Sequence, residues 1–219
     1  KYGKNLIGSF YQPNLVVSDI QFLKTLPKRE IICGYGEILK HAIIANKKFY
    51  NFLDKNYKKI LNLSSPFIEK AIFESCKIKK SVVEKDEKEK GVRKVLNFGH
   101  TFAHAYEASL GYSNKLNHGE AVILGMQTAL RFSLENNLLK QNEYHSIINH
   151  ISKVELPSEI KEYFKIRDLN KILLFMSKDK KNNTDKINLI LLNKIGFPII
   201  NKQYGKNYLS TFLKNVLRN

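Results

Sequence analysis

Cysteine is scarce in this chain of 219 residues, which contains only Cys33 and Cys76. The two lie far apart and match no metal-binding or redox spacing, which excludes a disulfide-rich scaffold and a cysteine-based zinc site. Two free thiols are typical of a reducing compartment. We therefore predict a cytoplasmic protein in which both cysteines pack as small hydrophobic side chains.

Long apolar runs are also missing. None approaches the ~20 consecutive apolar residues that a membrane-spanning helix needs, so we predict no membrane partner. The sequence contains no internal repeat and no low-complexity segment. Its hydrophobic content of 43% suits a globular core, and its length allows one sizeable domain or two small ones, since domains usually have ~100–200 residues.

Acidic residues are few: the chain has 20 aspartates and glutamates but 37 lysines and arginines, which gives a net charge of +17. Such an excess attracts phosphate, in nucleic acid or in a small anionic substrate. The basic residues are scattered, however, and lysine outnumbers arginine, whereas base readout favours arginine. We expect no nucleic-acid partner. The alternative, a basic nucleic-acid-binding helical domain, would show a steeply salt-dependent DNA affinity without metal dependence.

What the chain does have is a histidine-rich window, which holds three of its six histidines. His100 and His104 are four residues apart, so on a helix they share a face, with Glu107 one turn further along. His118 precedes the segment 121–134, which is apolar nearly all round and is predicted to be a buried helix. The short polar break between the two helices lets them run antiparallel, so that His118 folds back toward His100.

This grouping predicts a transition-metal site. Neutral imidazole is the commonest protein ligand of zinc, and catalytic zinc typically takes three protein ligands and keeps one open position. Spacing alone pairs His100 with His104 and requires a carboxylate from elsewhere. Thr101 occupies the place of the general base in the His-Glu-x-x-His motif, so that metalloprotease motif is excluded. The alternative is that these are ordinary core or surface histidines.

Glu37 is a candidate for the missing carboxylate. It sits among glycines and apolar residues, where a lone carboxylate is unfavourable unless a metal or a cation pairs with it. Lys40 lies three residues on, on the same helical face, so an ordinary surface Glu–Lys pair is the alternative. The other histidines have no ligand-like spacing: we expect His41 to be structural and both His145 and His150 to be solvated.

The periodicity predicts a mainly α-helical chain. A short strand is expected at Leu15–Ile20 and a β-hairpin at 187–192 and 198–201. Gly111 is expected to end the helix that begins near His100. Helices are expected at residues 25–45, 46–61, 66–83, 100–110, 121–134, 139–153, 168–177 and from about 206 onward.

These motifs, in this order and spacing, resemble the signature of 3-dehydroquinate synthases, the second enzymes of the shikimate pathway. The resemblance covers nearly the whole chain. It rests on the histidine window and on Gly3-Lys4-Asn5-Leu6-Ile7-Gly8, Gln12-Pro13, Thr25-Leu26-Pro27, Glu37-Ile38-Leu39-Lys40, Lys79, Arg93 and Asp179-Lys180-Lys181.

The resemblance implies a division of the chain. Residues 1–20 would be a remnant (loop and strand) of the N-terminal nucleotide-binding domain, which is expected to be missing. Residues 21–219 would be the α-helical metal- and substrate-binding domain, with one hairpin near its C-terminus. A chain without its nucleotide-binding half is expected to be inactive alone.

The resemblance also implies roles for individual residues. Glu37, His100 and His118 would bind a divalent metal, zinc or cobalt, while His104 would serve as a proton relay. The substrate would be a small anionic sugar phosphate, and NAD would be bound mainly by the missing domain. Full-length members are expected to be homodimers. The remaining implied site residues are Lys40 and Arg93 (catalytic), Lys79, Glu89, Asn97, Asn5, Lys180 and Lys181 (substrate) and Lys4 (cofactor).

The implied reaction is that of a carbon–oxygen lyase with catalytic NAD and a divalent metal. It cyclises 3-deoxy-D-arabino-heptulosonate 7-phosphate to 3-dehydroquinate with loss of phosphate, a step toward chorismate and the aromatic amino acids. Two alternatives share the metal site: a sister sugar-phosphate cyclase with different substrate contacts, and a metal-dependent polyol dehydrogenase, which would not release phosphate.

Overall fold

The computed structural model describes residues 11–157, 159–178 and 186–218. Its elements confirm the predicted fold class, a helical chain with one antiparallel hairpin near the C-terminus. Short 3-10 helices occur at Ile20–Thr25, Val92–Asn97, Ile160–Glu162 and Ile166–Asp168. The longer elements are α1 (Lys28–Ala45), α2 (Lys47–Leu61), α3 (Phe67–Lys85), α4 (His100–Ser109), α5 (His118–Glu135), α6 (Gln141–Lys153), α7 (Leu169–Lys178), β1 (Lys186–Lys194), β2 (Phe197–Gly205) and α8 (Lys206–Arg218).

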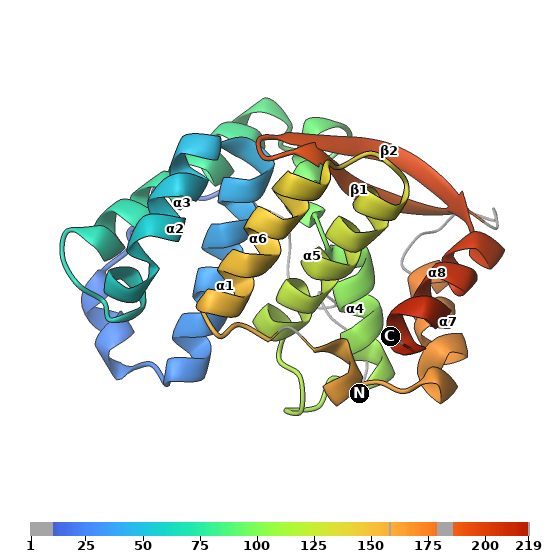
Figure 1. Ribbon diagram of the computed structural model, residues 1–219. Coiled ribbons are helices and arrows are strands. Elements are labelled where there is room, and N and C mark those ends of the chain that lie inside the picture. The colour runs from blue at the N-terminus through green and yellow to red at the C-terminus, as the bar shows by residue number, and fades with distance from the viewer. Residues whose placement is uncertain (1–10, 158, 179–185, 219) are drawn as a thin grey trace.

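Helix α5 lies in the middle of the molecule, as its apolar sequence predicts. It packs against α1, α4, α6 and β1, and most of its side chains are buried. Figure 1 shows α1, α2 and α3 on one side of α5 and α4, α7 and α8 on the other. A helix that is apolar all round can only be stable with neighbours on every side. The other helices are therefore arranged around α5.

The hairpin lies across one end of the helical bundle (Figure 1). Three of its backbone amides donate hydrogen bonds to helical residues: Leu192 to Ser133 Oγ of α5 (3.1 Å), Ile195 to Glu143 Oε2 of α6 (3.0 Å) and Gly196 to the carbonyl of Ile43 in α1 (2.8 Å). Because buried backbone donors need partners, these bonds fix the hairpin to three helices at once.

The predicted strand at Leu15–Ile20 is wrong. Residues 11–19 have no regular structure, and a 3-10 helix begins at Ile20, capped by the Asp19 side chain. Leu15, Val16 and Val17 are 78%, 72% and 79% exposed. A strand requires a hydrogen-bonded neighbour, and the one sheet of the described residues consists of β1 and β2. The assignment of residues 1–20 to another domain stays a prediction.

His150 was predicted to be solvated, which is wrong: it is fully buried. Its Nε2 lies 2.8 Å from the Tyr35 hydroxyl and its Nδ1 lies 2.9 Å from Asp54 Oδ1. His145 is exposed, as expected, and His41 is buried beside Ser75, with 2.7 Å between Nδ1 and Oγ. Cys33 is buried as predicted, whereas Cys76 is exposed, so the packing role predicted for Cys76 is wrong.

None of the described helices combines the length and the apolar character that a bilayer-spanning helix needs.

The buried network around His150 yields a stability prediction. The substitution His150→Leu leaves the Tyr35 hydroxyl, in a side chain only 2% exposed, without this partner, which should lower the free energy of unfolding at pH 7.5 by about 1–3 kcal/mol. Burial holds the pKa of His150 below its ordinary value, although Asp54 opposes that shift. The unfolded chain therefore takes up the proton first as the pH falls below ~6.5, and this part of the stability is lost.

Urea denaturation of the parent chain and the variant at pH 7.5 and pH 5.5 checks this. The difference in unfolding free energy between the parent chain and His150→Leu should be smaller at pH 5.5 than at pH 7.5. His145→Leu, on the exposed face of the same helix, is the control and should change stability by no more than ~0.5 kcal/mol. Equal effects of the two substitutions would contradict the role assigned to the buried network.

Candidate metal centre

Glu37, His100 and His118 come together although they lie on three different helices. Each offers one ligand atom, and these atoms all lie within 4.8 Å of one another. His100 and His118 are the first residues of α4 and α5, and their ring centroids are 5.7 Å apart, with 72° between the ring planes. The expectation that His118 folds back toward His100 is thus met. Their assignment as metal ligands stays a prediction.

The Glu37 carboxylate has one oxygen to spare for a cation. Its Oε2 accepts a hydrogen bond from Lys40 Nζ at 2.7 Å, while its Oε1 is buried and has no hydrogen-bond partner among the described residues. Burial raises the pKa of Glu37, but the charge and hydrogen bond of Lys40 outweigh burial and hold this pKa below its ordinary value. Because a buried ionised oxygen without a partner is unfavourable, its environment fits a bound cation.

Lys40 is not the exposed lysine that an ordinary surface Glu–Lys pair would contain. Its side chain is only 3% exposed, so this is no ordinary surface pair. Burial lowers the pKa of Lys40, opposed by the neighbouring Glu37 carboxylate, and the charge of Lys79 lowers it further. The influence of Lys79 indicates that α3 brings a second positive charge to this region.

His100 is in the protonation state that a metal ligand needs. Burial, followed by the positive charge of Lys40, lowers the pKa of His100 to about 3, so its ring is neutral at physiological pH. Its Nδ1 lies 3.3 Å from the Phe98 carbonyl oxygen, which suits a proton on Nδ1. The lone pair is then on Nε2, and neutral imidazole is the form that binds metal.

A network at the start of α5 fixes the backbone of His118. Asn117 caps the helix: its Oδ1 accepts from the backbone N–H of Glu120 at 3.0 Å, and Glu120 Oε2 accepts from the backbone N–H of Asn117 at 3.0 Å. Arg29 of α1 donates to both carboxylate oxygens of Glu120 at 2.6 Å. Cys33 Sγ, also in α1, lies 3.0 Å from Asn117 Oδ1. Such a reciprocal cap and a bidentate ion pair hold His118 relative to the helix that carries Glu37.

Two glycines let α5 approach its neighbours at backbone distance. A Cβ atom on Gly119 would lie 2.3 Å from the Cβ of Cys33 in α1, and one on Gly125 would lie 2.3 Å from the carbonyl oxygen of Gly99, just before α4. Gly99 itself has a φ of 79°, a conformation that favours glycine. These contacts bring the middle of α1, which carries Glu37, close to the starts of α4 and α5, which carry His100 and His118.

A second set of possible ligands overlaps the first at His118. It consists of His104, Glu107 and His118, again with ligand atoms within 4.8 Å of one another. Glu107 Oε2 lies 3.0 Å from His118 Nδ1. The pairing of His100 with His104, which spacing alone favours, occurs in neither of the two sets found among the described residues, although their rings lie 5.4 Å apart.

The described members of the expected substrate set lie on α3 and on the segment 89–97 that precedes α4. Lys79 is exposed on α3, and Asn97 donates a hydrogen bond to Glu89 Oε1. Arg93 donates to the Glu87 carbonyl oxygen. The predicted positions Lys4, Asn5, Lys180 and Lys181 lie outside the described residues.

Arg93 and His100 lie on separate helical elements. Arg93 belongs to the 3-10 helix Val92–Asn97, and the left-handed Gly99 separates it from α4. The close approach of Gly99 to α5 imposes this break, which local periodicity does not reveal.

Some residues that build the site were not predicted. The spacing of Asn117 and Glu120 is a capping-box pattern that the sequence displays openly. Glu107 was noted only as part of the histidine face. Arg29 has no local signal, because its partner is 91 residues away.

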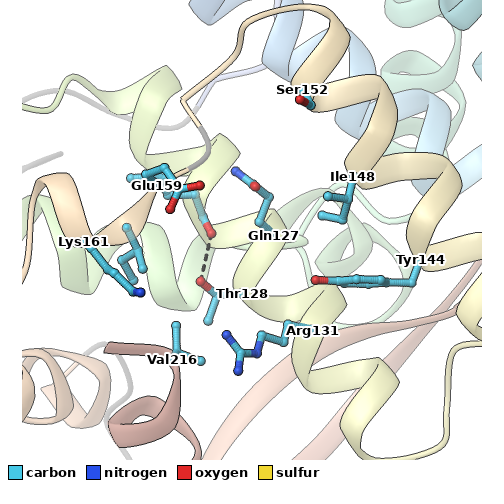
Figure 2. A pocket seen from close by; sticks show the side chains of 11 residues that line it. Gln127, Thr128, Arg131, Tyr144, Ile148, Ser152, Glu159, Lys161 and Val216 are labelled. Atoms are coloured by element: carbon cyan, nitrogen blue, oxygen red, sulfur yellow. Dashed lines mark hydrogen bonds between the residues drawn. The ribbon is translucent and has the colours of Figure 1, made fainter. Parts of the chain in front are cut away.

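A separate cleft of about 270 Å³ lies elsewhere and contains none of the predicted site residues. Figure 2 shows Gln127, Thr128 and Arg131 of α5 facing Tyr144 of α6 across it. Its lining is mixed, with Lys161 and Glu159 among the polar residues and Leu124 and Ile148 among the apolar ones.

The chain matches two family models. Residues 34–182 match the model described as 3-dehydroquinate synthase C-terminal, and residues 1–33 match the one described as 3-dehydroquinate synthase N-terminal. A 3-dehydroquinate synthase from Pelagibacter ubique is 61% identical over 99% of this chain and 59% of its own length. One from Desulforamulus reducens is 43% identical over 89% of this chain and 53% of its own length. The chain thus spans less than two thirds of these relatives.

Solved structures share the fold. A 2-deoxy-scyllo-inosose synthase complexed with carbaglucose-6-phosphate, NAD+ and Co2+ is similar with a TM-score of 0.82 and 26% identity, over 99% of this chain and 59% of that one. A 2-epi-5-epi-valiolone synthase from Streptomyces hygroscopicus with NAD+ and Zn2+ bound has a TM-score of 0.84 over 98% of this chain and 58% of that one, but at 18% identity it supports the fold alone.

The close packing of α5 on α1 yields a prediction about metal binding. Gly119→Ala places a Cβ atom against Cys33 and must move α5 away from α1, which separates His118 from Glu37. We expect Zn2+ affinity to fall by about tenfold or more, the loss that misplaced ligands typically produce. Gly34→Ala, where a Cβ meets nothing within 4 Å, is the control, and competition titration with a chromogenic chelator is the measurement. Unchanged affinity in Gly119→Ala would contradict the packing argument.

Proposed function

The chain belongs to the 3-dehydroquinate synthase family, and from that premise we propose that it forms the metal- and substrate-binding part of such an enzyme. The reaction is the conversion of 3-deoxy-D-arabino-heptulosonate 7-phosphate into 3-dehydroquinate with loss of phosphate. The observation that carries the proposal is the convergence of Glu37, His100 and His118 within 4.8 Å. One carboxylate and two imidazoles form a donor set of the catalytic metal type.

The cofactors are a divalent metal, zinc or cobalt, and NAD. The donor set supports the metal because Glu37 Oε1 is buried without a partner and His100 is neutral. Mixed nitrogen and oxygen ligands suit either ion. When bound, the metal supplies a Lewis acid at a substrate hydroxyl. We propose that NAD is held mainly by an N-terminal nucleotide-binding domain, with Lys4 as a contact from this chain.

Fixed positive charges of this chain bind the anionic substrate. The Lys40 ammonium, buried against Glu37, keeps that carboxylate ionised, and Lys79 adds a second positive charge near it. Arg93 offers a planar donor group that matches carboxylate or phosphate. Asn97 and Glu89, hydrogen-bonded to each other, would hold the adjoining loop against the substrate. Asn5, Lys180 and Lys181 complete the proposed substrate contacts.

His104 is the proposed proton relay. Its ring centroid lies 5.4 Å from that of His100 and 6.1 Å from that of His118, so it borders the metal position without belonging to the first ligand set. A neutral imidazole at this position can accept a hydroxyl proton on its free ring nitrogen and donate it again.

A sister sugar-phosphate cyclase is the second candidate, favoured by the similarity to the 2-deoxy-scyllo-inosose synthase bound to a sugar-phosphate analogue. It would share the metal ligands and differ in substrate contacts. Phosphate release by the full-length protein from the seven-carbon keto-acid phosphate, compared with release from glucose 6-phosphate, separates the two. Homodimer formation belongs to the proposal for the full-length protein.

Metal removal tests the proposed function. Chelation followed by dialysis of the full-length protein should abolish phosphate release, and Zn2+ or Co2+ should restore it. His100→Ala should lower kcat/KM by about 10³-fold, since Lewis-acid stabilisation is worth several kcal/mol. A coupled phosphate assay measures both effects, and His145→Ala, which alters an exposed histidine, is the control. Undiminished turnover of the metal-free protein would refute the proposal.

A further inference from the structure

Glu107 and His118 form a contact between a buried carboxylate and a half-exposed imidazole. The Glu107 side chain is 5% exposed, the His118 side chain is 47% exposed, and 3.0 Å separates Glu107 Oε2 from His118 Nδ1. Glu107 lies on α4, which also carries His100, while His118 begins α5. The contact therefore connects the two helices that supply the imidazoles of the metal centre.

His118 is the most exposed member of the predicted ligand set, because the other two are only partly exposed. The network around Asn117 fixes its backbone, but an exposed ring on a fixed backbone still rotates among its staggered conformers. Ordering such a side chain opposes metal binding through lost conformational entropy. A hydrogen bond that holds the ring beforehand removes part of that penalty.

The contact with Glu107 also decides which ring nitrogen carries the proton. An ionised carboxylate only accepts hydrogen bonds, so Nδ1 of a neutral His118 must be the donor. Nε2 then keeps its lone pair for a metal. A metal-binding histidine usually donates its other N–H to a carboxylate or a carbonyl, and His100 has the same arrangement with the Phe98 carbonyl.

We propose that Glu107 is a positioning residue for the metal centre: it accepts a hydrogen bond from Nδ1–H of His118 and so presents Nε2 to the position shared with Glu37 and His100. The inference rests on the proposed function, since it assumes that Glu37, His100 and His118 bind the metal. Glu107 itself makes no contact with the metal.

The competing possibility is a second cation between His104, Glu107 and His118. A second cation there would require His118 either to give up the hydrogen bond from Nδ1–H to Glu107 or to turn Nε2 away from the position shared with Glu37 and His100. The rings of His104 and His118 are stacked, with 23° between their planes, and imidazole lone pairs lie in the ring plane. The 72° between the rings of His100 and His118 is better suited to convergence on one ion. The geometry thus favours a positioning role for Glu107 over a ligand role.

Two measurements test the proposal on the purified, metal-free chain. The first is the tautomer of His118 by long-range ¹H–¹⁵N correlation in the parent chain. We expect the proton on Nδ1, and a proton predominantly on Nε2 would overturn the proposal without the need for any variant. The second is titration with Co2+, followed by its visible absorption, for the parent, Glu107→Gln and Glu135→Gln.

Glu107→Gln is nearly isosteric and removes the charge. We expect its dissociation constant for Co2+ to rise about 10- to 100-fold, with one equivalent still bound. Glu135→Gln, which removes a carboxylate from the ion pair with Arg131 at the far end of α5, is the matched control and should bind as the parent does.

The remaining outcomes are distinguishable. Equal Co2+ affinity of Glu107→Gln and the parent would overturn the positioning role and leave the proposed function intact. If the parent binds two equivalents of Co2+ and Glu107→Gln loses only the second, with unchanged affinity for the first, the positioning role would be overturned in favour of a second cation site. A parent chain that binds no Co2+ at all would count against the proposed function, while the tautomer of His118 would still decide the role of Glu107.

Discussion

The close docking of α5 onto α1 and α4 is the constraint on which the rest of this structure depends. Gly119 and Gly125 permit backbone-distance contacts in opposite directions, toward Cys33 and toward Gly99. Each contact joins α5 to a helix that supplies one member of the candidate metal centre. Arg29 and Glu120 reinforce the contact with α1 by a bidentate ion pair. The candidate metal centre is thus a consequence of how three helices pack, with no loop of the described residues supplying a member of the set.

Charge is distributed in this centre against the trend of the whole chain. The protein carries a net charge of +17, yet two carboxylates, the partly exposed Glu37 and the buried Glu107, lie beside the histidines. Each carboxylate has a positive or hydrogen-bond-donating partner: Glu37 pairs with the buried Lys40, and Glu107 contacts His118. Buried charges are stable only when paired. In the proposed function, a divalent cation and an anionic substrate would bind beside these pairs, and Lys40 and Lys79 would supply the positive charge for the substrate.

Much of this arrangement follows from local sequence signals. The helices, the hairpin across Gly196 and the return of His118 toward His100 depend on periodicity and turn residues, which act over a few positions. The predictions that are wrong concern residues whose structure depends on partners far away in the sequence. Leu15–Ile20 has strand-like residues but no neighbouring strand among the described residues, and His150 is buried by Tyr35 and Asp54, which are about 100 positions away. Lys4, Asn5, Lys180 and Lys181 stay predictions.

X-ray absorption spectroscopy at the zinc edge of the Zn2+-loaded chain tests the central claim most directly. The account predicts two imidazole nitrogens and one carboxylate oxygen at ~2.0–2.2 Å, with light atoms completing the coordination and no sulfur. A first shell with a sulfur ligand, or with fewer than two imidazoles, would contradict the convergence of Glu37, His100 and His118 on one ion.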